Sequence, residues 1–353
     1  MVSIDKSKPV AVTGASGYIA SWIVQILLEQ GFTVHATVRD PNKESAVGHL
    51  KKTAEGAKGS LRLFSADLLK EGNFDEALAG CELVIHTASP FVIKGFKDSY
   101  EALVRPAVEG TANVLNACNR HESVRRVVLT SSVASVYGDA IESTDVPGGV
   151  FTESHWNETS SLTHQPYSYS KVMAERKAWE MCKAQSRWDL VTINPALVMG
   201  PSLTTQTQST SIDVLRDLGS GVQKTGVPHL EFGVVDVRDV ANAHILAGFN
   251  PHAQGRFIVN AGTSSLLQMA QILRQKFPKY PLPKTELPKW LVKLVAPFVA
   301  GVSREFISKN VGYSISFDNT RSKKILGLSY RDLNVTLWEH FDQMIKDGLL
   351  KSR

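Results

Sequence analysis

The chain has 353 residues, of which 43% are hydrophobic and 21% are charged, an ordinary composition for a globular protein. This length allows one large domain or two modest ones with a sizeable buried core. The 39 basic and 34 acidic residues leave a net charge of +5, but the charges are interspersed and basic pairs such as Lys51-Lys52 stay short. We therefore expect neither nucleic acid nor a membrane surface as a partner, whereas the positive excess suits an anionic small ligand.

The cysteines and the apolar segments indicate a cellular compartment. Three cysteines lie far apart, which argues against a disulfide scaffold and for a reducing environment, and the histidines show no metal-ligand spacing. The first residues carry no signal-peptide pattern, and the longest apolar run, 291–302, is interrupted and too short to span a bilayer. These features predict a cytoplasmic protein without a metal site.

The first elements of the chain are a strand, a glycine turn and a helix. Val10–Val12 is apolar, residues 14–20 turn the chain, and apolar residues at helix spacing begin at Ile19. Gly14 can take a tight turn that other residues resist, and Gly17 lets the backbone approach phosphate oxygens closely. The free N–H groups at the helix start attract an anion. The pattern predicts a pyrophosphate-binding loop for a dinucleotide, with an ordinary strand-to-helix turn as the alternative.

Short apolar strands alternate with helices through the first 198 residues. We expect strands at Thr33–Val38, Leu61–Ser65, Leu83–His86, Val127–Thr130 and Leu190–Ile193, with helices at Phe74–Leu78, Tyr100–Cys118 and around Tyr167. This alternation, with nearly continuous apolar strands, predicts the α/β class and a doubly wound parallel sheet covered on both faces.

The pattern changes after Met199. Residues 202–211 predict a surface loop, and Phe232–Val240 and Arg256–Val259 are expected strands that return to the sheet. The proline-rich tail does not continue the alternation, and we expect its Trp290 and Phe298 in a core.

Two domains follow from this division. A dinucleotide-binding domain is expected over residues 1–198, with 230–260 partly returning to it, and a smaller substrate-binding lobe over 199–229 and 261–353.

The end of the second strand reads Val38-Arg39-Asp40. An acidic residue there usually binds the ribose hydroxyls of NAD, whereas an arginine matches a 2′-phosphate through charge-assisted hydrogen bonds. Arg39 therefore favours NADPH; in the alternative, Arg39 pairs with Asp40 or solvent and Asp40 binds the ribose. Asp67-Leu68, at the end of the third strand, suits a contact with the adenine edge, or a helix cap.

Tyr167 and Lys171 lie four residues apart and share one face of the expected helix. A phenol with the ordinary pKa of about 10 transfers protons poorly at neutral pH, and a nearby cation favours its phenolate form. The same spacing occurs at Tyr280 and Lys284, but two prolines between them prevent a regular helix. We therefore expect Tyr167 and Lys171 to carry acid–base chemistry.

Thr130-Ser131-Ser132 ends the fifth strand, at the edge of a parallel sheet where ligands bind. A hydroxyl there can polarise a substrate carbonyl, although either serine could instead cap the following segment. Two other sites favour a structural reading: His86 as a satisfied core histidine, and Asp236–Asp239 as a strand-end ion pair with a helix cap.

Together these segments resemble the extended short-chain dehydrogenase/reductase family over nearly the whole chain. The matching blocks are TGASGYIA, VRD, ADL, HTAS, TSS, YSYSK, NPALVMGP and VDVRDVA. Within the family, the chain is most similar to dihydroflavonol-reductase-like members and to yeast-type ketone and methylglyoxal reductases. The resemblance implies a Rossmann domain and the catalytic set Ser132, Tyr167 and Lys171, in which Tyr167 gives a proton to the carbonyl oxygen, Lys171 holds the nicotinamide ribose and Ser132 binds the carbonyl.

The resemblance also implies a set of cofactor contacts along the strand ends. These residues are Gly14, Ser16, Gly17, Tyr18, Ile19, Arg39, Asp67, Leu68, Thr87, Ala88, Tyr167, Lys171, Pro195, Leu197 and Val198.

Two departures from family patterns bear on the substrate. Tyr137 stands where plant dihydroflavonol reductases commonly carry an asparagine, and His164-Gln165-Pro166 replaces the run that precedes the catalytic tyrosine in cinnamoyl-CoA reductases. These departures favour a small aldehyde or ketone over a flavonoid or a thioester. We expect residues 91–96, Tyr137, 202–212 and the tail to line the substrate pocket.

The sequence thus predicts NADPH-dependent reduction of a small carbonyl compound by a monomer or homodimer. The alternatives are a nucleotide-sugar epimerase or dehydratase on the same scaffold, and a regulator that binds the dinucleotide without chemistry.

Overall fold

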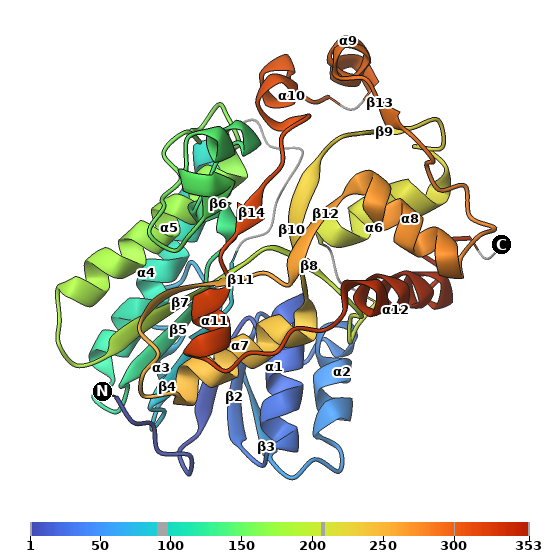
Figure 1. Cartoon of the computed structure of the whole chain (residues 1–353). Coiled ribbons are helices and arrows are strands. Elements are labelled where there is room, and N and C mark those ends of the chain that lie inside the picture. Colours follow the sequence, from blue (N-terminus) through green and yellow to red (C-terminus); the bar gives the residue numbers. More distant parts are fainter. Residues whose placement is uncertain (1, 90–97, 206–208, 300, 352–353) are drawn as a thin grey trace.

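The computed structural model describes residues 2–89, 98–205, 209–299 and 301–351 (Figure 1). Its largest sheet has seven strands, all parallel, in the order β11-β7-β5-β4-β1-β2-β3. The strands are β1 (Val10–Thr13), β2 (Thr33–Val38), β3 (Ser60–Ser65), β4 (Leu83–His86), β5 (Arg126–Thr130), β7 (Asp189–Pro195) and β11 (Gly255–Val259). The order reverses between β1 and β4, the point where such sheets bind ligands at their carboxyl ends. The predicted doubly wound α/β sheet is confirmed.

Helices cover both faces of this sheet (Figure 1). Side chains of β1 alternate between two cores, with Val10 and Val12 in one and Ala11 in the other, and this is why the strand is apolar throughout. The first core includes α1 (Tyr18–Glu29), α2 (Glu44–Ala54) and α7 (Val237–Phe249), and the second includes α3 (Asp75–Leu78), α4 (Arg105–Arg120) and α5 (Pro166–Lys183).

A second group of elements forms a separate core beside the carboxyl ends of the main sheet (Figure 1). It contains the three-stranded sheet β12-β10-β8 and three helices, with the bounds β8 (Leu197–Met199), β10 (Glu231–Asp236), β12 (Gly262–Ser265), α6 (Thr210–Ser220), α8 (Leu266–Lys276) and α12 (Leu333–Lys346).

The strand expected over Phe232–Val240 is wrong in its second half. Strand β10 ends at Asp236, whose carboxylate accepts a hydrogen bond from the Arg238 N–H (2.8 Å) and so caps helix α7. Strand β10 pairs with β8 and β12, whereas β11 joins the main sheet beside β7 as expected.

The C-terminal part adds short elements at the rim of the molecule. Helix α9 (Lys289–Val299) packs through Val292 against α10 (Arg304–Asn310), leaving Trp290 69% and Phe298 80% exposed. The expectation that these two side chains lie in a core is therefore wrong, because the helix is covered on one face only. Within the described residues, no helix is long and apolar enough to cross a bilayer.

The remaining short elements are η1 (Tyr100–Val104), η2 (Val133–Ser135), η3 (Ala140–Thr144), η4 (Pro147–Gly149), β6 (Val150–Phe151), β9 (Val227–Pro228), β13 (Glu286–Leu287), β14 (Ser316–Phe317) and α11 (Thr320–Lys324).

Candidate active site

The glycine turn between β1 and α1 has the geometry of an anion site. Gly14 has φ +66°, and a Cβ placed there would lie 2.8 Å from the Ala88 Cα. Helix α1 starts after Gly17 with neither a capping side chain nor an acidic residue in its first turn. Its first N–H groups and the positive end of its dipole therefore suit a phosphate group, and the residues present fit a dinucleotide pyrophosphate.

Backbone and side-chain bonds fix this turn against its neighbours. The Ala15 N–H donates to the Thr37 carbonyl of β2 (2.9 Å). The Thr13 hydroxyl oxygen accepts from the N–H groups of Thr87 (3.2 Å) and Ala88 (3.1 Å), which follow β4. The structure thus brings the predicted residues Thr87 and Ala88 directly to the glycine turn.

His86 lies beneath the same turn, fully buried at the end of β4. Its Nδ1 lies 2.7 Å from the Thr13 hydroxyl, while its Nε2 has no partner among the described residues. Burial, and then the Lys171 charge, lower the pKa of His86 to about 3, so the ring is neutral. The expectation of a fully satisfied core histidine is therefore wrong at one of the two ring nitrogens.

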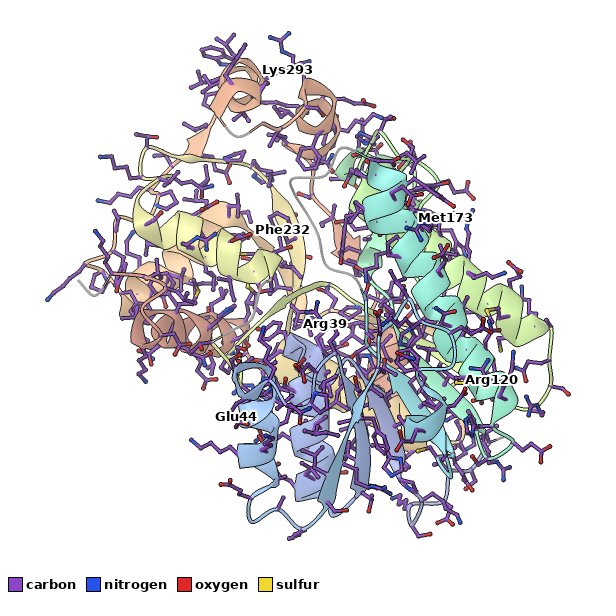
Figure 2. The ribbon with its side chains drawn as sticks, turned by 180° about the vertical axis from the view of Figure 1, so that it is seen from behind. Arg39, Glu44, Arg120, Met173, Phe232 and Lys293 are labelled. Carbon is purple, nitrogen blue, oxygen red and sulfur yellow. The ribbon has the colours of Figure 1, made fainter. Side chains whose placement is uncertain are left out.

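Arg39 follows β2 and is exposed at the edge of the main sheet that faces the second group of elements (Figure 2). Its guanidinium makes no ion pair within the described ranges, while Asp40 accepts from the Asn42 N–H (2.9 Å). The alternative pairing of Arg39 with Asp40 is not observed, and the Arg39 side chain remains available to a phosphate.

Asp67 and Leu68 follow β3. The Asp67 carboxylate accepts from the Leu69 N–H (3.0 Å) within a local turn, and because no helix starts at this turn the alternative role of a helix cap is not observed. The Leu68 side chain packs over Gly110 of α4, where a Cβ would lie 2.4 Å from the Leu68 Cγ.

Tyr18 is the first residue of α1, and its hydroxyl is hydrogen-bonded within the protein. It donates to the Gly200 carbonyl (2.5 Å), and burial raises the pKa of Tyr18 well above its usual value. Ser16 and Ile19 beside it are half-buried. Pro195 ends β7, and Leu197 and Val198 open β8, so the chain crosses here from the main sheet to the second group.

Tyr167 and Lys171 occupy the first turns of α5, which starts with Pro166 at a position where no backbone N–H is needed. The Lys171 Nζ lies 5.6 Å from the centre of the Tyr167 ring and donates to the Ser89 hydroxyl (3.0 Å) just beyond β4. By contrast, the Tyr280–Lys284 segment forms no helix, as expected.

Ser132 follows β5, the next strand of the sheet. Its hydroxyl accepts from the Ala134 N–H (3.1 Å) and caps η2, which packs against α5. The carboxyl ends of β1, β4 and β5 and the start of α5 therefore bring the predicted catalytic residues to one edge of the sheet.

A buried carboxylate that the sequence analysis missed supports this arrangement from behind. Glu175 of α5 accepts from the hydroxyls of Ser131 and Ser135 (both 2.5 Å) and from the guanidinium of Arg256 in β11 (2.7 Å). Burial raises the pKa of Glu175, but the Arg256 charge and these hydrogen bonds outweigh burial and hold it below its usual value. Its only sequence signal is its position two turns after Tyr167.

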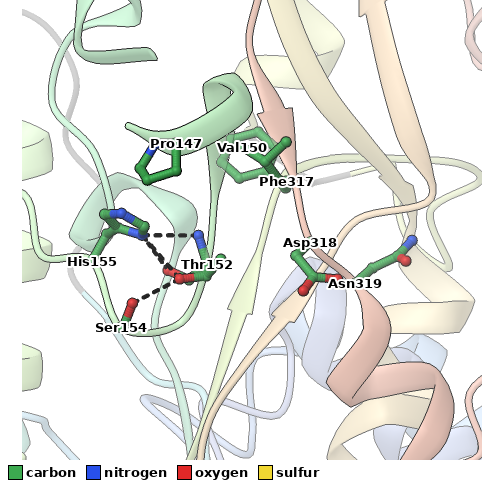
Figure 3. Close-up of a pocket in the computed structure, with 8 residues that line it drawn as sticks. All are labelled: Pro147, Val150, Thr152, Ser154, His155, Phe317, Asp318 and Asn319. Carbon is green, nitrogen blue, oxygen red and sulfur yellow. Dashed lines mark hydrogen bonds between the residues drawn. The ribbon is translucent and has the colours of Figure 1, made fainter. Parts of the chain in front are cut away.

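A shallow depression of 660 Å³ lies elsewhere, where β6 and the segment after it face β14 (Figure 3). His155 and Asp318 are among its lining residues, and it contains none of the predicted site residues. Tyr137, expected in the substrate pocket, stacks on Phe151 with ring centres 5.0 Å apart. Residues 91–96, also expected there, lie outside the described residues.

A family match spans most of the chain. Residues 10–262 match the model of the NAD dependent epimerase/dehydratase family. The chain belongs to this family. Its members include the extended short-chain dehydrogenases/reductases that the sequence resembles.

Several similar proteins are named as reductases. The chain is 45% identical to a cinnamoyl-CoA reductase from Medicago truncatula, over 80% of this chain and 85% of the relative. It is 42% identical to tetraketide alpha-pyrone reductase 1 from Arabidopsis thaliana, with the same coverage of 80% and 85%. A yeast methylglyoxal/isovaleraldehyde reductase complexed with NADPH has a similar structure, with a TM-score of 0.78, 29% identity and coverage of 96% and 99%.

These similarities bear on the reaction class. They confirm the expected likeness to dihydroflavonol-reductase-like and yeast-type reductases, the oxidoreductase class acting on carbonyl groups, and NADPH as the cofactor.

Proposed function

We propose that the protein reduces a small aldehyde or ketone to the alcohol with NADPH and that Tyr167 is the proton donor. One observation carries the proposal: Lys171 contacts the Tyr167 ring and the Ser89 hydroxyl at the edge of the sheet where the glycine turn lies. A cation in this place can bind a ribose hydroxyl and favour the phenolate that forms when Tyr167 gives up its proton.

The remaining roles follow from position. The glycine turn from Gly14 to Ile19 would hold the pyrophosphate, Arg39 the 2′-phosphate, and the Asp67 region the adenine. NADPH supplies the hydride when bound. Ser132 donates a hydrogen bond to the substrate carbonyl oxygen, which orients the carbonyl and draws electrons from its carbon. The Tyr167 phenol then donates its proton to that oxygen.

Two local features support a small substrate. Tyr137 offers no amide for ring hydroxyls and packs on Phe151, and Gln165-Pro166 precede the tyrosine in place of the cinnamoyl-CoA reductase pattern. The similar yeast structure is named for methylglyoxal and isovaleraldehyde.

We further propose that residues 199–229 and 261–353 form the substrate-binding lobe.

The test is NADPH oxidation against a panel of small aldehydes, ketones, keto esters, flavonoids and cinnamoyl-CoA. We expect turnover with the small carbonyls, and Tyr167→Phe to lower kcat by ~100-fold or more while the Kd for NADPH stays within about twofold. Tyr169→Phe is the matched control, because this tyrosine lies on the same helix without a lysine four residues on. Near-normal turnover by Tyr167→Phe would contradict the proposal.

A nucleotide-sugar epimerase or dehydratase is the alternative on this scaffold. NAD that stays bound through purification, together with a silent carbonyl panel, would favour it. The exposed Arg39, which we assign to the 2′-phosphate of the cofactor, supports the NADPH-dependent reductase instead.

A further inference from the structure

Asp139 is a buried carboxylate close to the catalytic helix, and the proposed mechanism assigns it no role. Its side chain is 1% exposed and is surrounded by hydrogen-bond donors. Oδ2 accepts from the His164 Nε2 (2.7 Å), and Oδ1 accepts from the amides of Gln165 (2.7 Å) and Asn310 (2.6 Å). Two of these three donors come from the residues just before Pro166 and Tyr167.

Gln165 has a left-handed backbone conformation, which residues with a Cβ rarely adopt. Its φ of 53° makes it the one residue other than glycine with positive φ in the described part of the chain. It is the N-cap of α5, so its conformation sets the direction in which the helix leaves the preceding turn. The Gln165 amide bonds to the Gly138 carbonyl (2.5 Å) and to Asp139, and these bonds hold the turn in place.

Asn310 connects this turn to the C-terminal part of the chain. It is the last residue of α10 and 7% exposed. Both the nitrogen and the oxygen of its side-chain amide form hydrogen bonds with residues 139 and 140. The Asn310 Nδ2 donates to Asp139, and its Oδ1 accepts from the Ala140 N–H (2.9 Å). The two partners are 171 residues apart in sequence.

We propose that Asp139 is a positioning residue for the reduction, and that Asn310 acts through it. By holding Gln165 and His164, Asp139 fixes the first turn of α5 and thereby the place of the Tyr167 hydroxyl. Asn310 ties that turn to α10, so the C-terminal elements help to set the position of the proton donor. This inference rests on the proposed role of Tyr167.

Three variants test the contacts from different sides. Asp139→Asn keeps the shape but replaces one acceptor oxygen with an amide NH2 group, which only donates. Asn310→Ala removes the contact from α10, and Gln165→Gly relaxes the positive φ while it removes the side-chain amide. Ser308→Ala on α10 is the control, because among the described residues its hydroxyl bonds only to the Arg304 carbonyl (2.9 Å) of its own helix. For each variant, kcat and KM are measured with the best small carbonyl of the panel, along with the Kd for NADPH and the thermal midpoint.

We expect kcat to fall about tenfold to 100-fold in the three variants, because a displacement of ~1 Å at a reacting group can cost this much. The Kd for NADPH and the activity of Ser308→Ala should change less than about twofold. Gln165→Gly gives a further readout: glycine relieves the positive φ, which offsets part of the stability lost with the two amide hydrogen bonds. Its thermal midpoint should therefore fall less than that of Asp139→Asn while kcat falls as far, a split that a purely structural role would not give.

Unchanged kcat in Gln165→Gly and Asn310→Ala would overturn the inference, even if Asp139→Asn does not fold. If Tyr167→Phe abolishes turnover in the same assay, the proposed function stands and the positioning role alone fails. If Tyr167→Phe is active, the proposed function fails first.

Discussion

Replacement of Glu175 by glutamine tests the network behind the catalytic edge of the sheet. The change keeps the shape of the side chain and removes its charge. Ser131 and Ser135 can reorient, since a hydroxyl both donates and accepts. The Arg256 guanidinium cannot reorient in this way, because it only donates and stays buried at 7% exposure.

The expected loss can be estimated from these contacts. Removing one partner of a buried ion pair costs roughly 3–5 kcal/mol, since the other charge stays buried without its counterion. Arg256 retains the carbonyls of Glu153 (2.9 Å) and His155 (2.5 Å), and its guanidinium lies 4.0 Å from the centre of the Trp156 ring. We therefore expect Glu175→Gln to lose about 3 kcal/mol, the lower end of that range.

Urea unfolding at pH 7, followed by tryptophan fluorescence, measures this loss. The midpoint should fall with an unchanged m-value, because the change does not alter the surface exposed on unfolding. The double variant Glu175→Gln/Arg256→Met removes both charges, so it should recover part of the stability.

The pH dependence provides a second readout. The folded pKa of Glu175 is lowered, so its contribution is present above its unfolded pKa of about 4.3 and is lost as the pH falls through the folded pKa. The difference between wild type and Glu175→Gln should therefore shrink in acid. A loss below about 1 kcal/mol at pH 7, or a difference that grows in acid, would refute the reasoning.

Three further predictions concern His244, Gly14 and Arg39. Burial lowers the pKa of His244 to about 4, so between pH 6.5 and 4 only the unfolded chain is protonated there and stability falls on acidification. His244→Gln should lower this slope by about 1.4 kcal/mol per pH unit in urea titrations, and an unchanged slope would argue against a neutral His244. Gly14→Ala places a Cβ against the Ala88 backbone at positive φ. It should lower the free energy of unfolding by roughly 1–2 kcal/mol in thermal unfolding and weaken NADPH binding in fluorescence titrations. Wild-type stability and affinity would contradict a close approach of Gly14 to Ala88. Arg39→Gln should raise the Kd for NADPH about tenfold or more and leave that for NADH within twofold, whereas equal losses would argue against a 2′-phosphate contact.

The sequence alone determined the main sheet and the residues at its carboxyl edge. The apolar strands, the glycines of residues 14–17 and the spacing of Tyr167 and Lys171 are local patterns. Each depends on the conformation of a few neighbouring residues, so the sequence predicts it directly. Parallel strands end at one edge of a sheet, so residues that follow β1, β4 and β5 had to lie near one another.

The tertiary structure alone decided how this edge is supported. Helix α9 leaves Trp290 exposed because only one of its faces is covered. Glu175 is hydrogen-bonded to Arg256, which lies 81 residues away in sequence, and Asp139 to Asn310, which lies 171 residues away. Such contacts depend on how distant elements pack, and a hydrogen bond between distant residues has no local spacing that a sequence pattern can show.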